Sequence, residues 1–447
     1  MNETILQSLR DFSIDNYYPI VKRDLDLGQP FTPKVGNLVK VVKGMRRSGK
    51  SYRLFQEMDA LHNSGVPWSQ ICYFNFEDDR LRPITSKTGD EVIEAFTFLH
   101  PEATQGVYFF FDELQEMQDW GSWLRRIVDT KKATIYVSGS SSQMLSSEIS
   151  TEFRGRAIDF ELLPCSFKES LRFSQEFVET NQNTYTTEEK LKLIGAFEVY
   201  LERGGFPSIQ QLPRSQRIAL LQSYAQRVVA RDVVERHNLS RPRVVSAFAT
   251  RILASNAREL SIRKVENDFR SVGLATSRGF MRDLLAYFEE AYLVFTVREL
   301  SRALSETSTA PQKVYAIDPG LALANSRASS TDEGQCLENA VYLELRRRLV
   351  GMRKDEISSY KTKLHGFEID FVAGDVLAGN LELYQVSVSV ENEKTLQRET
   401  RALWEAMEEL HVSEAKLIVE KGEHAEYQQG KKRIVQIPAW KWFLETS

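Results

Sequence analysis

The sequence predicts an α/β protein whose core is a parallel sheet with helices on both faces. Three observations support this expectation. Short apolar runs alternate with helical patterns from residue 38 to residue 163, the runs are rich in β-branched and aromatic residues, and a glycine-rich loop follows the first run. Such runs are typical of buried parallel strands joined by crossover helices. The expected strands are Leu38–Val42, Ile71–Phe76, Val107–Phe111, Thr134–Val137 and Ile158–Leu163.

Length and composition narrow the class of protein. The chain has 447 residues, which suits two to four domains at roughly 150 residues each. Apolar residues make up 42% and charged residues 27%, as in ordinary globular proteins. Because the net charge is only −4, any nucleic-acid surface must be a local basic patch.

Several classes of protein are disfavoured by the sequence. The cysteines, Cys72, Cys165 and Cys336, form no C-x-x-C pair, so neither a disulfide framework nor a zinc site is indicated. The six histidines show no metal-ligand spacing. No signal peptide is recognisable, and no apolar run reaches the roughly 20 residues of a membrane span. We therefore expect a cytoplasmic protein.

Changes of pattern along the chain predict five parts. The strand signal fades after residue 180, where helical spacing takes over. Ser261 and Ser277 are suited to begin the second and third of three short helices, and two extended stretches follow, which is the winged-helix order. The parts are a lead-in at 1–35, a core at 36–180, a helical lid at 181–240, a winged helix at 241–318 and a third α/β domain at 319–447. The third domain is expected to end with a helix at Glu393–Leu410 and two closing strands.

The glycine-rich loop, Gly44–Ser51, fits the phosphate-binding pattern G-x-x-x-x-G-K-[ST] between a strand and a helix. Glycines let backbone N–H groups surround phosphate oxygens, and the helix N-terminus adds positive potential. Lys50 would contact the β- and γ-phosphates of ATP, and Ser51 would bind Mg²⁺. Further nucleotide contacts are expected from Gly44, Arg46, Arg47, Ser48, Gly49 and Tyr52.

A second element supports hydrolysis. The apolar strand Val107–Phe111 delivers Asp112 and Glu113 at its end. Asp112 would hold Mg²⁺, and Glu113 would polarise the attacking water. The next strand ends in Ser138-Gly139-Ser140, so Ser140 or Ser138 would position that water, although a plain Gly/Ser turn is an equal alternative.

Two arginines precede the last strand of the core. Arg154 and Arg156 have the charge needed to stabilise the transition state as an arginine finger, which in a ring assembly reaches the neighbouring subunit's nucleotide. The alternative is a structural pair that bridges acidic surface residues. The sequence does not separate the two.

Several motifs together resemble a large family of prokaryotic AAA+-type ATPases. That family joins an ATPase core of the P-loop (AAA+/ASCE) type to a winged helix and a C-terminal PD-(D/E)XK nuclease-like domain. The resemblance implies Lys50, Ser51, Asp112 and Glu113 as the catalytic set, Ser140 as the sensor, Arg154 and Arg156 as finger candidates, and Pro207 near the adenine. The motifs are Gly44–Ser51, Phe111–Gln115, Trp120 with Leu124–Arg126, Ser138–Ser141, Arg154–Arg156 with Leu163–Glu169, and Gly204–Pro207.

The expected winged helix carries a basic cluster. Candidate DNA contacts are Arg263 and Lys264 on its second helix and Arg278 and Arg282 on its third, with Arg270, Arg298 and Arg302 nearby. Asp283, Glu289 and Glu290 on the same third helix favour the alternative, a protein–protein module.

The third domain follows the order of a PD-(D/E)XK nuclease, with Glu338 on a helix and Asp370 on a strand. Gln385 stands where the next acidic ligand belongs, and Ser387 stands where the lysine belongs. A working site needs carboxylates for a divalent cation and a lysine to activate water. We therefore expect a retained fold that binds DNA or a partner without cutting.

Three functional hypotheses follow. The first is an ATP-hydrolysing, Mg²⁺-dependent motor that binds and remodels DNA, including junctions or ends, as a homo-oligomer such as a hexameric ring. The second is a nucleotide switch in signalling or phage defence, with tight nucleotide binding and slow turnover. The third is an ATP-regulated nuclease.

Overall fold

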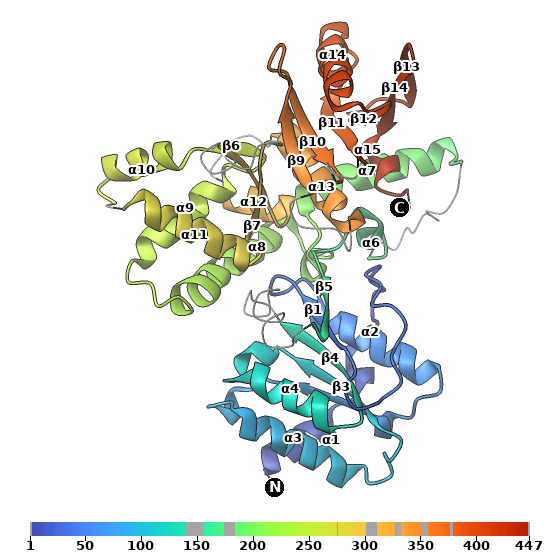
Figure 1. Cartoon of the computed structure of the whole chain (residues 1–447), viewed down its shortest axis with the longest axis vertical. Coiled ribbons are helices and arrows are strands. Elements are labelled where there is room, and N and C mark those ends of the chain that lie inside the picture. The colour runs from blue at the N-terminus through green and yellow to red at the C-terminus, as the bar shows by residue number, and fades with distance from the viewer. Residues whose placement is uncertain are drawn as a thin grey trace. The chain divides into compact units, whose positions relative to one another are not determined.

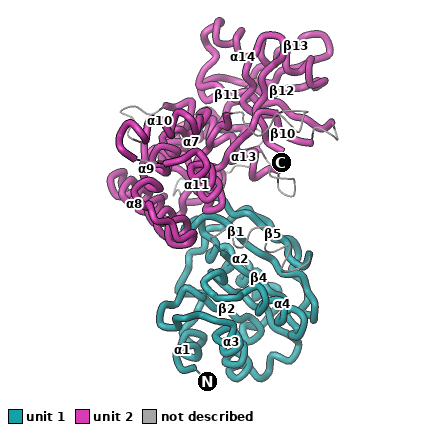
Figure 2. The backbone as a smooth tube through the Cα atoms, turned by 60° about the vertical axis from the view of Figure 1, so that its left-hand side comes forward, with its two compact units in different colours: residues 1–163 teal, residues 164–447 magenta. Residues whose placement is uncertain are grey.

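The computed structural model describes residues 2–139, 155–173, 184–274, 276–300, 311–326, 332–349, 356–375 and 379–445. The chain forms two compact units, Met1–Leu163 and Pro164–Ser447 (Figure 2). The sequence placed the end of the core at residue 180, whereas the first compact unit of the structure ends at Leu163. Phe167, beyond that boundary, packs edge to face against Phe197 of the second unit.

The first unit contains the five predicted parallel strands. They are β1 (Val39–Lys43), β2 (Ile71–Asn75), β3 (Val107–Asp112), β4 (Ala133–Gly139) and β5 (Ala157–Glu161), arranged β2-β3-β4-β1-β5. All neighbouring strands pair in parallel, which confirms the predicted fold class for this core. Because the strands run in parallel, the ends of β1, β3 and β4 lie at one edge of the sheet.

Helices cover both faces of this sheet (Figure 1). Side chains alternate between faces along a strand, so β3 sends Phe109 and Phe111 to one core and Tyr108 and Phe110 to the other. The first core is closed by α1 (Glu3–Asp11), α3 (Ser86–Leu99) and α4 (Trp120–Thr130), and the second by α2 (Lys50–Asn63). Short 3₁₀ turns lie at η1 (Ile14–Tyr17), η2 (Trp68–Gln70), η3 (Asp79–Leu81) and η4 (Leu114–Glu116).

The second unit begins with helices that pack around the glycine pair Gly204-Gly205. The elements are α6 (Phe167–Leu171), α7 (Thr187–Arg203), η6 (Pro207–Ile209), α8 (Arg214–Arg227), the π-helix η7 (Val228–Glu235) and α12 (Pro319–Asn325). Gly205 donates its N–H to Asp318 Oδ2 (2.6 Å) and accepts from the Cys165 N–H (2.7 Å). The pair therefore joins three segments that are distant in sequence.

Three helices and a small antiparallel sheet follow in the same unit. They are α9 (Pro242–Leu253), β6 (Arg258–Leu260), α10 (Ile262–Ser271), α11 (Arg278–Glu290), β7 (Val294–Val297) and β8 (Gln312–Ala316), with sheet order β6-β8-β7. Ser261 and Ser277 cap α10 and α11 with their side chains, as the sequence indicated.

The C-terminal part is a six-stranded mixed sheet with order β13-β14-β12-β11-β10-β9. Its elements are α13 (Glu333–Arg348), β9 (Ile357–Lys361), β10 (Glu368–Ala373), β11 (Glu382–Ser389), α14 (Glu393–Leu410), β12 (Glu414–Lys421), β13 (Ala425–Gln429), β14 (Lys432–Pro438) and α15 (Ala439–Trp442). The sequence predicted two closing strands, but three are present. Among the described residues, no helix combines the length and apolar character needed to cross a bilayer.

The glycine pair gives a stability test. A Cβ at Gly205 would lie 2.1 Å from the Cys165 carbonyl oxygen, whereas a Cβ at Gly195, within α7, would meet nothing within 4 Å. We predict that Gly205→Ala lowers the free energy of unfolding by about 1–3 kcal/mol or more through overpacking. Gly195→Ala is the matched control and should raise it by about 0.5–1 kcal/mol, because alanine favours the helix. Urea unfolding of both variants measures the difference; equal effects would contradict this packing.

Candidate functional site

The phosphate loop has the backbone that its glycines require. It connects β1 to α2, and Gly49 at the helix N-cap has φ +99°, a left-handed conformation that favours glycine. A Cβ at Gly44 would lie 2.2 Å from the Leu162 carbonyl oxygen, so only glycine allows this close approach. The loop therefore presents the N-terminus of α2, where unpaired N–H groups and the helix dipole favour an anion.

Lys50 and Glu113 form a buried ion pair next to the loop. Lys50 is only 3% exposed, and its Nζ lies 3.3 Å from Glu113 Oε1 and 3.3 Å from the Met45 carbonyl oxygen. Glu113 has φ +51°, a conformation uncommon outside glycine, which turns it away from the strand direction. The lysine and the acidic pair thus converge as the sequence predicted.

Asp112 is held by groups from neighbouring strands. Tyr73 on β2 donates its hydroxyl to Asp112 Oδ2 (2.8 Å), and Ser138 on β4 donates to Oδ1. Burial and then the charge of Glu113 raise the pKa of Asp112, while hydrogen bonds from Ser138, Ser51 and Tyr73 lower it, with a net rise. The link between Ser51 and Asp112 brings the two predicted Mg²⁺ ligands together.

The charge state of Glu113 suits a base. Although burial alone would raise the pKa of Glu113, the cations Lys50 and Arg46 outweigh it and hold the pKa below its usual value. Glu113 is therefore ionised at neutral pH. Its backbone N–H donates to the Ser138 hydroxyl oxygen (3.1 Å).

Of the two sensor candidates, Ser138 is built into this network. Its hydroxyl donates to Asp112 and accepts from the Glu113 N–H, so it holds the acidic pair in place. Ser140 lies outside the described residues.

The residues present fit a polyphosphate with Mg²⁺. The Ser48 hydroxyl is buried and has no hydrogen-bond partner among the described residues, so a phosphate oxygen would supply the missing partner. Lys50 Nζ and the N-terminus of α2 would hold the β- and γ-phosphates. Ser51 and Asp112 offer the oxygen ligands that Mg²⁺ prefers.

Three further side chains were predicted to contact the nucleotide, namely Arg46, Arg47 and Tyr52. Arg46 forms ion pairs with Glu77 and Glu116, both at 3.0 Å, so its charge is largely satisfied by protein carboxylates. Arg47 is exposed and has φ +70°. Tyr52 is 44% exposed and packs edge to face against Tyr17.

Arg23 bonds the backbone of the phosphate loop, a contact that sequence reasoning missed. It lies in the lead-in, it is 5% exposed, and its guanidinium donates to the carbonyl oxygens of Ser48 (2.7 Å) and Leu163 (2.8 Å). No local motif marks it, because its partners are distant in sequence.

Arg156 lies at the edge of the sheet opposite to the phosphate loop. β1 and β5 pair in parallel from Val39 with Ala157 to Lys43 with Glu161, so Arg156 is level with the start of β1 and the loop follows its end. Its guanidinium pairs with Asp129 on α4. Arg156 therefore cannot serve the loop of its own chain. Arg154 lies outside the described residues.

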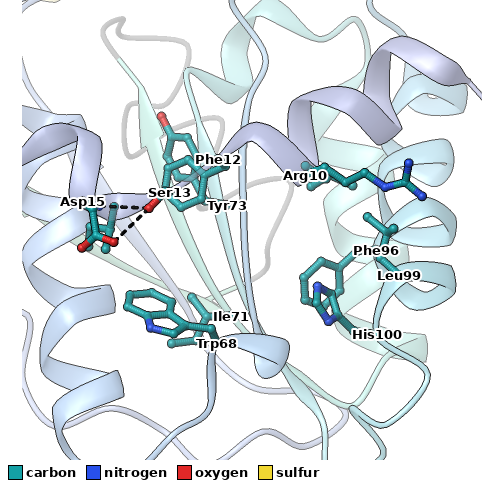
Figure 3. A pocket seen from close by; sticks show the side chains of 12 residues that line it. Arg10, Phe12, Ser13, Asp15, Trp68, Ile71, Tyr73, Phe96, Leu99 and His100 are labelled. Carbon is teal, nitrogen blue, oxygen red and sulfur yellow. Dashed lines mark hydrogen bonds between the residues drawn. The ribbon is translucent and has the colours of Figure 1, made fainter.

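A separate cavity of about 470 Å³ lies beside β2 (Figure 3). Phe12 stacks on Tyr73 with ring centroids 4.5 Å apart, and Arg10 and His100 lie on the other side of the cavity. Tyr73 is shared between this cavity and the Asp112 network, since its hydroxyl bonds Asp112.

In the second unit, Pro207 begins η6 after the glycine pair. The backbone of Gly204–Phe206 makes hydrogen bonds to Tyr200, Gln210, Cys165 and Asp318, all within the same unit.

The four predicted basic contacts on α10 and α11 are Arg263, Lys264, Arg278 and Arg282, and all four are exposed. Arg278 and Arg270 are both paired with the buried Glu266, at 2.6 Å and 3.0 Å.

The three residues predicted for a degenerate nuclease site, Glu338, Asp370 and Gln385, do come together. The Asp370 N–H donates to Gln385 Oε1 at 3.4 Å. Lys313 of β8, which the sequence did not single out, places its Nζ 3.0 Å from Glu338, 2.7 Å from Glu368 and 3.4 Å from Asp370. Among the described residues, no group of three or more histidine, cysteine or acidic side chains is arranged to hold a metal ion.

The pKa values of Lys313 and Asp370 in this cluster are shifted from their ordinary values. Burial acts to lower the pKa of Lys313, but the carboxylates of Glu338, Asp370 and Glu368 outweigh it and raise the pKa. Burial and then the charge of Glu338 raise the pKa of Asp370 to about 8, against the opposing effect of Lys313. The lysine ammonium is therefore the cation of this site.

Comparisons with known protein families agree with the fold and the phosphate loop of the first unit. Residues 36–171 match the family model of the AAA domain, and residues 194–332 match that of a domain of unknown function, DUF8612. The first unit therefore contains a P-loop domain of the AAA type.

Two relatives extend the match along the chain. The uncharacterized protein MJ1544 of Methanocaldococcus jannaschii is 32% identical over 449 residues, covering 99% of this chain and 94% of its own. The chain belongs to the family of that archaeal protein. An uncharacterized protein of Haemophilus influenzae is 26% identical, covering 79% of this chain and 84% of its own.

Among solved structures, the Walker-type ATPase PABY2304 of Pyrococcus abyssi is 15% identical, with a TM-score of 0.43 over 65% of this chain and 91% of that chain.

The Asp370 cluster gives a pH test. Its folded pKa of about 8 lies above the unfolded value of about 3.9, so its contribution to stability is fully present below about pH 4 and is lost as the pH rises through 8. We predict that the free energy of unfolding of the wild type, relative to Asp370→Asn, falls by up to about 1.4 kcal/mol per pH unit between pH 5 and 8. Denaturant unfolding across this range measures it. A pH-independent difference would contradict a protonated Asp370.

Proposed function

We propose that this protein binds Mg·ATP in its first unit, hydrolyses it, and uses the hydrolysis to act on DNA. The observation that carries the ATPase proposal is the hydrogen-bonded group of Lys50, Glu113, Asp112 and Ser138 at the edge of the sheet where the phosphate loop lies. Binding of ATP without a base would need only the loop. The ionised Glu113 beside Lys50 adds the group that hydrolysis requires.

In this proposal, each side chain has one task. The N-terminus of α2 and Lys50 Nζ bind the β- and γ-phosphates and stabilise their charge as the bond breaks. Ser51 and Asp112 hold Mg²⁺, which neutralises charge on the phosphate oxygens. Once Lys50 contacts the phosphates, Glu113 is free to orient the attacking water and accept its proton.

A substitution at Glu113 tests its role as the base. Glu113→Gln should reduce the turnover number about 100-fold or more while ATP binding persists, because the amide cannot accept the proton. Lys50→Ala should lose most nucleotide binding. Glu91→Gln, a partly exposed acid on α3, is the matched control and should behave as the wild type. Phosphate release and equilibrium binding measure the two effects; full turnover in Glu113→Gln would exclude Glu113 as the base.

The position of Arg156 supports a finger that acts on a neighbouring subunit. Arg156 lies across the sheet from its own phosphate loop, so we propose that the protein works as a homo-oligomer, such as a hexameric ring, in which Arg156 or Arg154 completes the next site.

A mixing experiment tests this arrangement. Lys50→Ala subunits lack nucleotide binding but keep Arg156, and Arg156→Ala subunits bind nucleotide but lack the finger. If the finger acts between subunits, mixtures of the two inactive variants should regain ATPase activity above the sum of the separate proteins. An unchanged sum, with mixed oligomers shown to form, would refute a role for Arg156 between subunits.

The proposed DNA contact is the face of α10 and α11. We propose that α9, β6, α10, α11, β7 and β8 form a winged helix, whose element order they follow. Arg263, Lys264 and Arg282 are exposed on its second and third helices. Such side chains bind phosphates and give an affinity that falls with salt.

We predict that replacing Arg263, Lys264 and Arg282 together by alanine weakens DNA binding and reduces the slope of log affinity against log salt by about 2 to 3, one unit per lost phosphate contact. The control is Arg214→Ala, which removes an exposed arginine from α8. A panel of double-stranded, single-stranded and branched DNA also measures stimulation of the ATPase. Unchanged salt dependence, with no DNA stimulation, would favour the nucleotide-switch hypothesis.

We further propose that the C-terminal part is a nuclease-like fold that does not cut. Lys313 lies among the carboxyl groups of Glu338, Glu368 and Asp370, so a divalent cation would have to displace an internal ammonium. Cleavage of DNA with Mg²⁺ or Mn²⁺ that disappears in Asp370→Ala and persists in Lys50→Ala would restore the nuclease hypothesis.

A further inference from the structure

The end of β5 is attached to the start of the phosphate loop. β5 ends at Glu161, and the next two residues, Leu162 and Leu163, are the last of the first unit. The Leu162 N–H donates to the Lys43 carbonyl oxygen (2.8 Å), immediately before the loop. The Leu162 carbonyl oxygen lies so close to Gly44 that no side chain fits there. A displacement of the start of the loop would therefore displace Leu162 as well.

Arg23 attaches the same exit segment to the other end of the loop. Its guanidinium donates to the carbonyl oxygens of Ser48 (2.7 Å) and Leu163 (2.8 Å). Ser48 directly precedes the N-cap of α2. Both ends of the loop thus connect to Leu162–Leu163, one directly and one through Arg23.

Arg23 is itself held firmly. Its backbone N–H donates to Gln56 Oε1 (2.8 Å), and Gln56 Nε2 donates back to the Arg23 carbonyl oxygen (3.1 Å). The side chain is 5% exposed, so its hydrogen bonds do not compete with bulk water. A planar guanidinium presents several donors in a fixed fork, whereas a lysine ammonium is a point charge on a flexible stem.

A bound nucleotide would act on this connection at Ser48. The Ser48 hydroxyl is buried without a partner among the described residues, so a phosphate in the loop would engage Ser48 from one side while Arg23 holds its carbonyl from the other. We infer that Arg23 is a positioning residue that transmits nucleotide occupancy from the phosphate loop to Leu162–Pro164, where the chain passes into the second unit. This inference rests on the proposed nucleotide site. It adds the route by which binding of nucleotide at that site would affect Leu162–Pro164.

Hydrogen exchange of peptides containing Leu162, Leu163 and Cys165 tests the inference. The full chain is compared without nucleotide and with Mg²⁺ and a non-hydrolysable ATP analogue, as wild type, Arg23→Lys and Arg23→Gln. In the wild type, nucleotide should slow exchange in these peptides. In both variants, the analogue should bind with an affinity within about threefold of the wild type, because the Arg23 guanidinium bonds backbone carbonyl oxygens and is not among the groups proposed to hold the phosphates. The slowing should be lost in both.

Controls separate this role from a general loss of structure. Arg126→Gln, an exposed arginine paired with Asp90 in the same unit, should keep the nucleotide-dependent slowing. Circular dichroism shows whether each variant folds, and the wild-type comparison stands even if both Arg23 variants fail to fold.

The outcomes are distinct. If the wild type binds the analogue but exchange at Leu162–Cys165 does not change, or if Arg23→Lys keeps the full effect, the inference is overturned and the proposed ATPase site is untouched. If the wild type binds no nucleotide, the proposed function fails and the inference fails with it.

Discussion

The ion pair between Lys50 and Glu113 is the constraint on which the nucleotide site depends. Both side chains are buried and their charged atoms lie 3.3 Å apart. Removing one partner from such a pair leaves an uncompensated buried charge, which costs about 3–5 kcal/mol. Lys50 therefore leaves Glu113 only when another anion takes its place. In the proposed mechanism, a phosphate group in the loop is that anion, and its arrival would free Glu113 to act as the base when substrate is bound.

The sheet order explains why the groups around this pair converge. β3 lies between β2 and β4, and all three end at the same edge. Asp112 at the end of β3 can therefore receive the Tyr73 hydroxyl from one side and the Ser138 hydroxyl from the other. The same parallel geometry places Arg156, at the start of β5, at the opposite edge. The same topology therefore gathers the loop, Lys50 and the acidic pair at one edge and keeps Arg156 away from them.

The sequence was informative where the signal is local. The five strands appear as apolar runs, the phosphate loop and the acidic pair are short motifs, and the caps at Ser261 and Ser277 depend on neighbours within a few positions. The extra closing strand, β13, escaped prediction because it is mostly exposed and polar, so it has no apolar alternation.

Contacts between distant residues could not be predicted in this way. Arg23 bonds residues 25 and 140 positions away, and Lys313 lies among carboxylates up to 57 positions away. Neither residue belongs to a motif, and each acquires its role only when strands from different parts of the chain meet. The predicted cluster of Glu338, Asp370 and Gln385 formed, but its cation came from β8, outside the pattern.

The most direct test of the central claim is the affinity of Glu113→Gln for a non-hydrolysable ATP analogue with Mg²⁺, compared with the wild type by calorimetric titration. If phosphate must draw Lys50 away from Glu113, the variant should bind the analogue more tightly than the wild type, while the affinity for adenosine, which has no phosphates, should not change. Equal or weaker binding of the analogue by Glu113→Gln would contradict the exchange of Lys50 between Glu113 and the phosphates.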